Sequence, residues 1–136
     1  MNVPIRVDAV TVDCSDPHRL AGFWSALLGV AVKEVGPDFA ELASIGPEGP
    51  SLLFLQVPDA KAGKNRLHLD LEVGDMAAAV EEALTLGATR AEGALAGPFQ
   101  WVVMLDPEGN EFCLCPGGGR PTDTGAEPIP PQPLPY

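Results

Sequence analysis

The stretch that decides the fold reads IRVDAVTVDCSDPHRLAGFWSALLG, residues 5–29. Its first part, residues 5–13, alternates β-branched and polar side chains, which is typical of a half-buried strand. Asp16 and Pro17 then supply a helix N-cap and a first helical residue. Apolar side chains follow at helical spacing, and Gly29 provides a C-cap. The segment therefore predicts a strand followed by one amphipathic helix.

The same order recurs in RLHLDLEVGDMAAAVEEALTLG, residues 66–87. Asp75 follows Asp16 by 59 residues, and Gly87 follows Gly29 by 58 residues. A pattern of strand, cap, helix and closing glycine that repeats at nearly one period indicates an internal duplication.

Each helix is followed by three short segments that predict strands, separated by Gly and Pro turns. The predicted strands lie at residues 5–13, 30–35, 39–45, 52–57, 66–73, 88–92, 99–105 and 111–115. The fold class is therefore α+β, with two tandem βαβββ units at residues 5–57 and 66–115 in one domain spanning residues 1–115. The turn DPEGN, residues 106–110, is predicted to be structural, because Asp-Pro and Gly-Asn are common turn residues.

The last part of the chain, residues 116–136, has a different composition. It holds seven Pro and four Gly among 21 residues and has no apolar period. Such a segment predicts a Pro/Gly-rich extended tail. An alternative function for the whole chain is an interaction module that recruits a partner through this tail.

Charge and cysteine usage restrict the partners. The 136 residues carry 8 Lys and Arg against 19 Asp and Glu, a net charge of -11, and no apolar run is long enough to span a membrane. A surface this acidic repels phosphate groups, so we expect neither nucleic acid nor a membrane as a partner. The three cysteines, an odd number, and an N-terminus unlike a signal peptide predict a cytoplasmic protein with free thiols.

Four motifs give the chain a family resemblance. They are DPHRLAGFWSALLG (16–29), KNRLHLDLEVGD (64–75), LGA (86–88) and DPEGNEFCLC (106–115). On paired βαβββ units they resemble the vicinal oxygen chelate superfamily, the glyoxalase, bleomycin-resistance and extradiol dioxygenase group, in its glyoxalase-like domain branch. The resemblance covers residues 5–115 and implies one curved mixed sheet around a cavity. It does not specify a reaction, since one fold hosts many functions.

The resemblance also implies positions for a metal, one on the first and one on the last strand of each unit. In the second unit these positions hold His68 and Cys113, and in the first unit they hold Ala9 and Leu55. A catalytic divalent metal typically takes three protein ligands and keeps an open position. One good ligand and one thiol predict a degenerate site with no metal and no cofactor; a divalent metal at His68 is the alternative.

Strand alternation and the geometry of the superfamily place one set of polar side chains on the concave side of the sheet. The candidate catalytic residues are His68, Asp70 and Glu111, and the candidate ligand-binding residues are Thr11, Asp13, Trp101 and Cys113.

Three hypotheses for this set stay open. His68 acts as a general acid or base with Asp70 or Glu111, as in a lyase or isomerase of the superfamily. Alternatively, the polar groups anchor a cationic small molecule that stacks on Trp24 or Trp101. In the third hypothesis His68 and Asp70 only satisfy one another. The sequence favours a glyoxalase-like small-molecule-binding protein, with drug or metabolite sequestration as its role, and the resemblance implies a homodimer.

Overall fold

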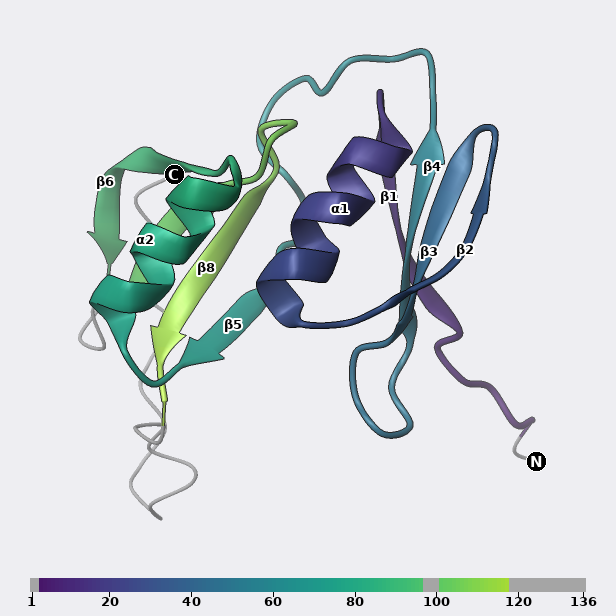
Figure 1. The fold of residues 1–136 in the computed structure, drawn as a ribbon, viewed down its shortest axis with the longest axis horizontal. Coiled ribbons are helices and arrows are strands. Elements are labelled where there is room, and N and C mark those ends of the chain that lie inside the picture. Colours follow the sequence, from purple (N-terminus) through teal and green to yellow (C-terminus); the bar gives the residue numbers. More distant parts are fainter. Residues whose placement is uncertain (1–2, 97–100, 118–136) are drawn as a thin grey trace. The chain divides into compact units, whose positions relative to one another are not determined.

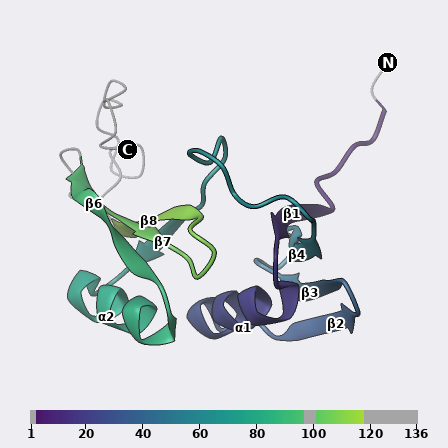
Figure 2. The same cartoon turned by 90° about the horizontal axis from the view of Figure 1, so that it is seen from above.

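The computed structural model describes residues 3–96 and 101–117, with residues 92–96 described through their backbone alone. The chain divides into two compact units, Met1–Lys61 and Ala62–Tyr136. Each unit has the element order β-α-β-β-β that the duplication predicts, with its helix on one face of its own four-stranded sheet (Figures 1 and 2). The predicted tail lies outside the described residues beyond Gly117.

The first unit contains one helix and a mixed sheet. Its elements are β1 (Ala9–Cys14), α1 (Pro17–Leu28), β2 (Val32–Gly36), β3 (Phe39–Ser44) and β4 (Ser51–Gln56). The strand order is β1-β4-β3-β2, with β1 parallel to β4 and the other pairs antiparallel.

The second unit repeats this arrangement. Its elements are β5 (Asp70–Val73), α2 (Met76–Leu86), β6 (Thr89–Ala96), β7 (Trp101–Leu105) and β8 (Glu111–Pro116). The strand order is β5-β8-β7-β6, with β5 parallel to β8 and the other pairs antiparallel. The α+β class is thus confirmed, and the hydrogen bonds among the described residues join the strands into two four-stranded sheets, neither of them closed.

Both helix ends form as the sequence predicts. The carboxylate of Asp16 accepts the Arg19 backbone N–H at 3.1 Å, and that of Asp75 accepts the Ala78 N–H at 3.0 Å. Gly29 and Gly87 close the helices at φ 67° and 117°, a region that disfavours any residue with a Cβ.

The first strand of the first unit is shorter than predicted. Residues 5–8 lie outside β1, and Ile5 is 86% exposed. The partner strand β4 begins at Ser51, whose N–H reaches the Asp8 carbonyl, and the next N–H that would face β1, that of Gly49, donates instead to the Gly46 carbonyl at 3.2 Å. Without a ladder partner, residues 5–7 cannot continue the strand.

The first strand of the second unit is also shorter, since β5 begins at Asp70 rather than at residue 66. The last ladder bond at this end runs from the Cys113 N–H to the Leu69 carbonyl at 2.9 Å. Beyond it, the side-chain amide of Asn65 donates to the Glu111 carbonyl at 3.4 Å. The Asn65 side chain thus occupies the β8 carbonyl to which a longer β5 would have donated its next backbone N–H.

Each unit has its own apolar layer between helix and sheet. In the first, Leu20, Phe23 and Trp24 of α1 are buried, and the two rings meet edge to face at 5.4 Å. In the second, β7 and β8 supply Val102, Met104, Phe112 and Leu114 to this layer, while Val103 and Cys113 are buried on the opposite face of the sheet. No helix in the described part of the chain is long and apolar enough to cross a membrane.

Candidate functional site

The parallel pairing of β5 with β8 builds the centre of the candidate site. Asp70 lies opposite Cys113 in the ladder, so both side chains project from one face of the sheet. His68 precedes Asp70 by two residues in the segment that leads into β5 and approaches the same face. The structure thus brings together three of the residues that the sequence selected.

These three side chains form a close cluster of donor atoms. His68 Nε2 lies 3.4 Å from Asp70 Oδ1, an ion pair when the imidazole is protonated. One ligand atom from each of His68, Asp70 and Cys113 lies within 4.8 Å of the others. The Asp70 side chain is 47% exposed and that of His68 is 25% exposed, whereas Cys113 is 2% exposed. The cluster therefore has a buried sulfur end and an end open to solvent.

Glu111 is buried at the start of β8, at 8% exposure. Its carboxylate accepts the Asn65 backbone N–H at 3.2 Å, and its carbonyl accepts the Asn65 side-chain amide. These contacts fix the chain three residues before His68. The position of Asn65 could not be found from strand alternation, because the residue lies in the loop before the strand. A catalytic role for Glu111 stays a prediction.

The two tryptophans have different surroundings. Trp24 is 4% exposed and packs against Phe23, so it belongs to the core and is not available for stacking on a ligand. Trp101 begins β7 and, by alternation, shares a face with Val103, which lies opposite Cys113. The indole Nε1 of Trp101 is buried and has no hydrogen-bond partner among the described residues. A ligand oxygen is one acceptor that would satisfy it.

Thr11 and Asp13 lie on the exposed face of β1 in the first unit. In the ladder they are opposite Leu53 and Leu55 of β4. Their grouping with His68 into one pocket stays a prediction.

The comparisons with known proteins agree with this architecture. Residues 9–115 match the family model described as "Glyoxalase-like domain". The chain belongs to the glyoxalase-like domain family. It is thus a member of the vicinal oxygen chelate superfamily that the motifs indicate.

Several solved structures share the glyoxalase-like fold. A glyoxalase/bleomycin resistance protein/dioxygenase family enzyme from Burkholderia phytofirmans PsJN is 19% identical, with a TM-score of 0.69 over 82% of this chain and 98% of that one. A glyoxalase-related enzyme from Fulvimarina pelagi is 18% identical, with a TM-score of 0.64 over 82% and 88%. The fosfomycin resistance protein FosX from Mesorhizobium loti is 13% identical, with a TM-score of 0.62 over 93% and 100%. No curated protein sequence matches the chain. Identities this low show the fold alone.

The ligand positions that the resemblance implies do not fit a metal in the first unit of this glyoxalase-like chain. Ala9 has no donor atom. The parallel register of β1 with β4 makes Leu53, rather than the predicted Leu55, the counterpart of Cys113. Neither leucine can coordinate a metal, so on either alignment the first unit supplies no ligand at these positions. The cluster of donor atoms is confined to the second unit.

Proposed function

We propose that this glyoxalase-like chain is a small-molecule-binding protein whose ligand is a basic organic compound, with sequestration of that compound as its role. One observation carries the proposal: a single face of the second sheet presents an indole from β7 and two exposed carboxylates from β5. These groups are Trp101, Asp70 and Glu72.

The chemistry of this face suits a cation. An ammonium or guanidinium group gains from nearby carboxylates and from the face of an indole. The net charge of -11 adds a long-range attraction for cations, which salt screens beyond about 10 Å at 0.1 M. The buried Nε1 of Trp101 offers one hydrogen bond to an oxygen of the same ligand.

The test is a thermal-shift and calorimetry screen of amines and guanidines, each paired with a neutral compound of the same shape, in buffer with a chelator. We expect only the cations to raise Tm, with an affinity that falls as salt increases. Glu72→Gln and Trp101→Phe should each weaken binding by roughly three- to tenfold, the range expected for one charge or cation–π contact.

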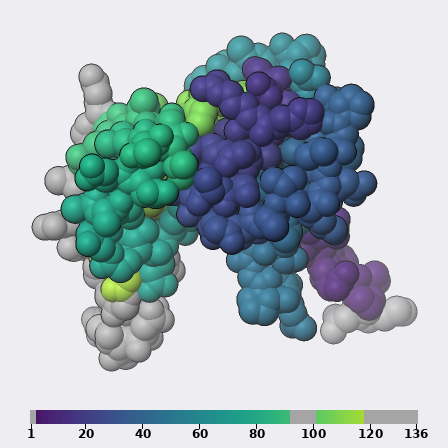
Figure 3. Space-filling model, in the orientation of Figure 1, coloured from purple at the N-terminus to yellow at the C-terminus, as the bar shows by residue number. Residues whose placement is uncertain are grey.

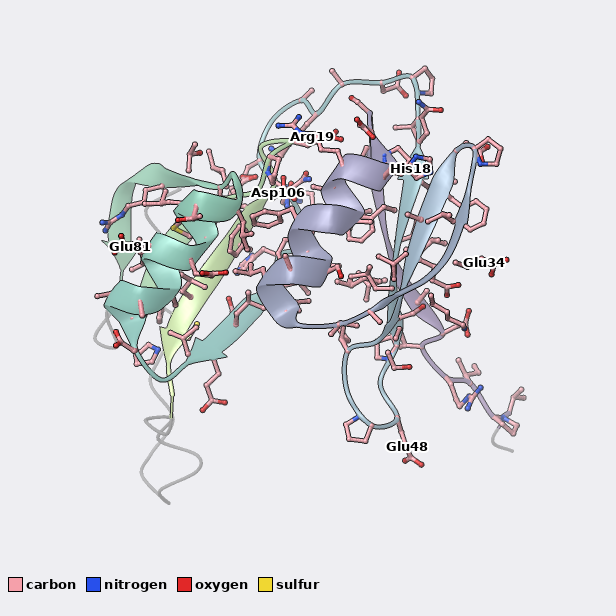
Figure 4. All side chains as sticks on the ribbon, in the orientation of Figure 1. His18, Arg19, Glu34, Glu48, Glu81 and Asp106 are labelled. Atoms are coloured by element: carbon pink, nitrogen blue, oxygen red, sulfur yellow. The ribbon has the colours of Figure 1, made fainter. Side chains whose placement is uncertain are left out.

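The matched control is Glu34→Gln on β2, an exposed glutamate of the first unit (Figure 4). It removes the same charge from the chain as Glu72→Gln and leaves the polar face intact. If Glu34→Gln and Glu72→Gln weaken cation binding equally, the effect comes from the net charge of the chain and not from the polar face. Neutral compounds that raise Tm as much as the cations would contradict a cation site.

A second candidate is a lyase or isomerase in which His68 moves a proton. The 3.4 Å contact between His68 Nε2 and Asp70 Oδ1 favours it, because a neighbouring carboxylate orients an imidazole for proton transfer. Any compound that passes the binding screen can be incubated in D2O and followed by NMR. Carbon–deuterium exchange that is lost in His68→Gln supports the enzyme; binding without exchange supports the binder.

The homodimer, the cytoplasmic location and the tail interaction that the sequence predicts extend this proposal. Light scattering on the full chain measures its mass in solution and so tests the homodimer.

A pull-down with the full chain and with a chain ending at residue 115 tests whether residues 116–136 recruit a partner. Capture of the same partner by both chains would reject the interaction module.

A further inference from the structure

We propose that residues 127–135, in the Pro/Gly-rich tail, dock in an apolar groove along helix α2 of the same chain. The groove lies on the helix side of the second sheet: Val102 of β7 lines it, whereas the next residue, Val103, lies opposite Cys113 on the other face. The inference goes beyond the proposed function, because the face that carries Asp70 and Trp101 takes no part in it.

The groove is formed around one stripe of α2. Met76, Val80 and Leu84 follow one another at four-residue spacing, so they lie on one side of the helix. Leu84 is 43% exposed, and the groove has a volume of about 750 Å³. Arg90, which also lines it, lies at the C-terminal end of the helix. An apolar stripe thus faces an open groove with a guanidinium at one end.

The tail starts beside the other end of the groove. The Gly117 N–H donates to the Val73 carbonyl at 2.8 Å, and Val73 ends β5 three residues before α2 begins at Met76. Because β5 and β8 are parallel, they end at the same edge of the sheet (Figure 1). The chain after Gly117 therefore continues from a point next to the first turn of α2.

The tail is long enough to reach the far end of the groove and return. Helix α2 has 11 residues and is about 16 Å long. Residues 118–127 can span about 33 Å, and three of these ten are Gly, which permits a reversal of direction. Residues 128–135 then run back along the helix, where Ile129 and Leu134 lie about 16 Å apart in a polyproline II conformation.

The chemistry of residues 127–135, EPIPPQPLP, suits this groove. The five prolines favour an extended conformation before docking, so little conformational entropy is lost. The carboxylate of Glu127 meets the Arg90 guanidinium, and the apolar side chains of Ile129 and Leu134 cover the stripe. The ion pair at the C-terminal end of α2 sets the direction, so the docked segment runs antiparallel to the helix.

We expect docking to be weak in free energy but measurable locally. The ion pair is exposed to solvent and the apolar contacts are few, so docking should add little to the free energy of unfolding. The tether raises the effective concentration of the segment to about the millimolar range, so a low intrinsic affinity suffices. A free peptide of residues 126–136 should therefore bind only at about millimolar concentration.

NMR spectra of the full chain and of a chain ending at Gly117 test the inference. Beyond the first turn of α2, the amide signals of the helix and of Arg90 should differ between the two chains, whereas those of α1 should coincide. The free peptide, added to the shortened chain, should move the α2 signals towards their positions in the full chain. Coincident α2 signals in the two chains would overturn the inference.

Two double variants of the full chain form a matched pair. Ile129→Asp with Leu134→Asp should return the α2 signals to their positions in the shortened chain. Thr122→Asp with Thr124→Asp adds the same charge outside the docked segment and should leave these signals in place. Equal displacement by both double variants would show an effect of charge alone and would reject the docked segment.

The pair of Arg90 and Glu127 is tested by exchanging the charges. Arg90 is exposed, so its replacement leaves the core intact. Arg90→Glu and Glu127→Arg should each shift the α2 signals towards those of the shortened chain, and the two together should restore them. Without this restoration, the antiparallel placement of the segment is wrong.

Dilution distinguishes the tail of the same chain from a second copy. Docking within one chain is independent of concentration, so the α2 signals should not change on roughly tenfold dilution. Signals that change on dilution, with a fall in mass by light scattering, would assign the groove to a second copy and overturn the inference. Organic cations should bind the shortened chain as tightly as the full chain, so failure of docking and failure of the proposed function give separate results.

Discussion

The two units share one element order and one pair of helix caps, but their helices pack differently. Helix α1 buries a continuous row of side chains against its sheet, including Leu20, Phe23 and Trp24. Helix α2 buries Ala83 alone, and Leu84 is 43% exposed in a groove that it lines with Val80. In Figure 3, residues of α2 (green) form part of the visible surface. The first unit thus has the better-packed helix.

The second unit, whose helix is less well packed, has the sheet face with the more reactive side chains. In the first unit Thr11 lies opposite Leu53, and at the equivalent place in the second unit Asp70 lies opposite Cys113. The same place in the ladder therefore carries an apolar leucine side chain in one copy and a cysteine thiol in the other. The comparison teaches that a duplicated scaffold can keep packing in one copy and concentrate reactive side chains in the other.

The largest expected effect tests the packing difference with one substitution in two places. Leu20→Ala should lower the free energy of unfolding by about 2–5 kcal/mol, because Leu20 is fully buried and its removal leaves a cavity. Leu84→Ala should cost less than about 1 kcal/mol, because much of its side chain is already in water. Urea denaturation followed by circular dichroism measures both.

Equal costs for the two leucines would break the comparison. They would mean that α2 is covered in solution, for example by a second copy of the chain. Light scattering on the same samples separates that case, since loss of a dimer would accompany Leu84→Ala.

A smaller effect is expected at the turns between the last two strands of each unit. In the second unit the buried carboxylate of Asp106 accepts the Glu108 and Asn110 backbone N–H groups and the Asn110 side-chain amide. In the first unit Gly46 occupies the matching place, and its carbonyl accepts the Gly49 N–H. Asp106→Ala leaves the Glu108 and Asn110 donors of the second unit unsatisfied. It should lower the free energy of unfolding by about 2–3 kcal/mol, the scale for hydrogen bonds to a charged group.

Asp106→Asn is the control, because an amide oxygen replaces one of the two acceptors and keeps the shape. It should recover part of the loss in urea denaturation. A cost below about 0.5 kcal/mol for Asp106→Ala would show that the backbone alone holds this turn, as in the first unit.

The parts of the fold that depend on local chemistry could be predicted from the sequence. The caps at Asp16 and Asp75 and the closing glycines are correct because each involves residues within one or two helical turns. The starts of β1 and β5 were predicted too early, because a strand begins only where a partner can donate and accept hydrogen bonds. The Gly49 N–H is bonded to the Gly46 carbonyl, and the Glu111 carbonyl is bonded to Asn65.

The candidate site was predictable to a similar extent. Alternation placed Asp70 and Cys113 on one face, which the ladder supports, and the approach of His68 to Asp70 follows from their spacing. Alternation could not distinguish Leu53 from Leu55 as the partner position, because that choice depends on the register between two strands whose paired residues are 42 positions apart in the chain. The sequence also could not predict that Asn65 anchors the loop before His68, because contacts made by loops follow no sequence period.

The smallest effect concerns the feature that the units share. Asp16→Ala and Asp75→Ala should each cost about 1 kcal/mol, because each removes the side-chain acceptor of one helical N–H. Hydrogen exchange should show lost protection at the Arg19 and Ala78 amides, respectively. Asp→Asn at either site should restore most of it, since asparagine caps about as well as aspartate. The packing difference predicts one asymmetry: the loss at Asp16 should spread through α1 only if Leu20 is also truncated, whereas the loss at Asp75 should spread through α2 in the single variant. Equal, confined losses in both single variants would show that the cap and the strands hold α2 without a buried apolar row, and would remove the main contrast between the two units.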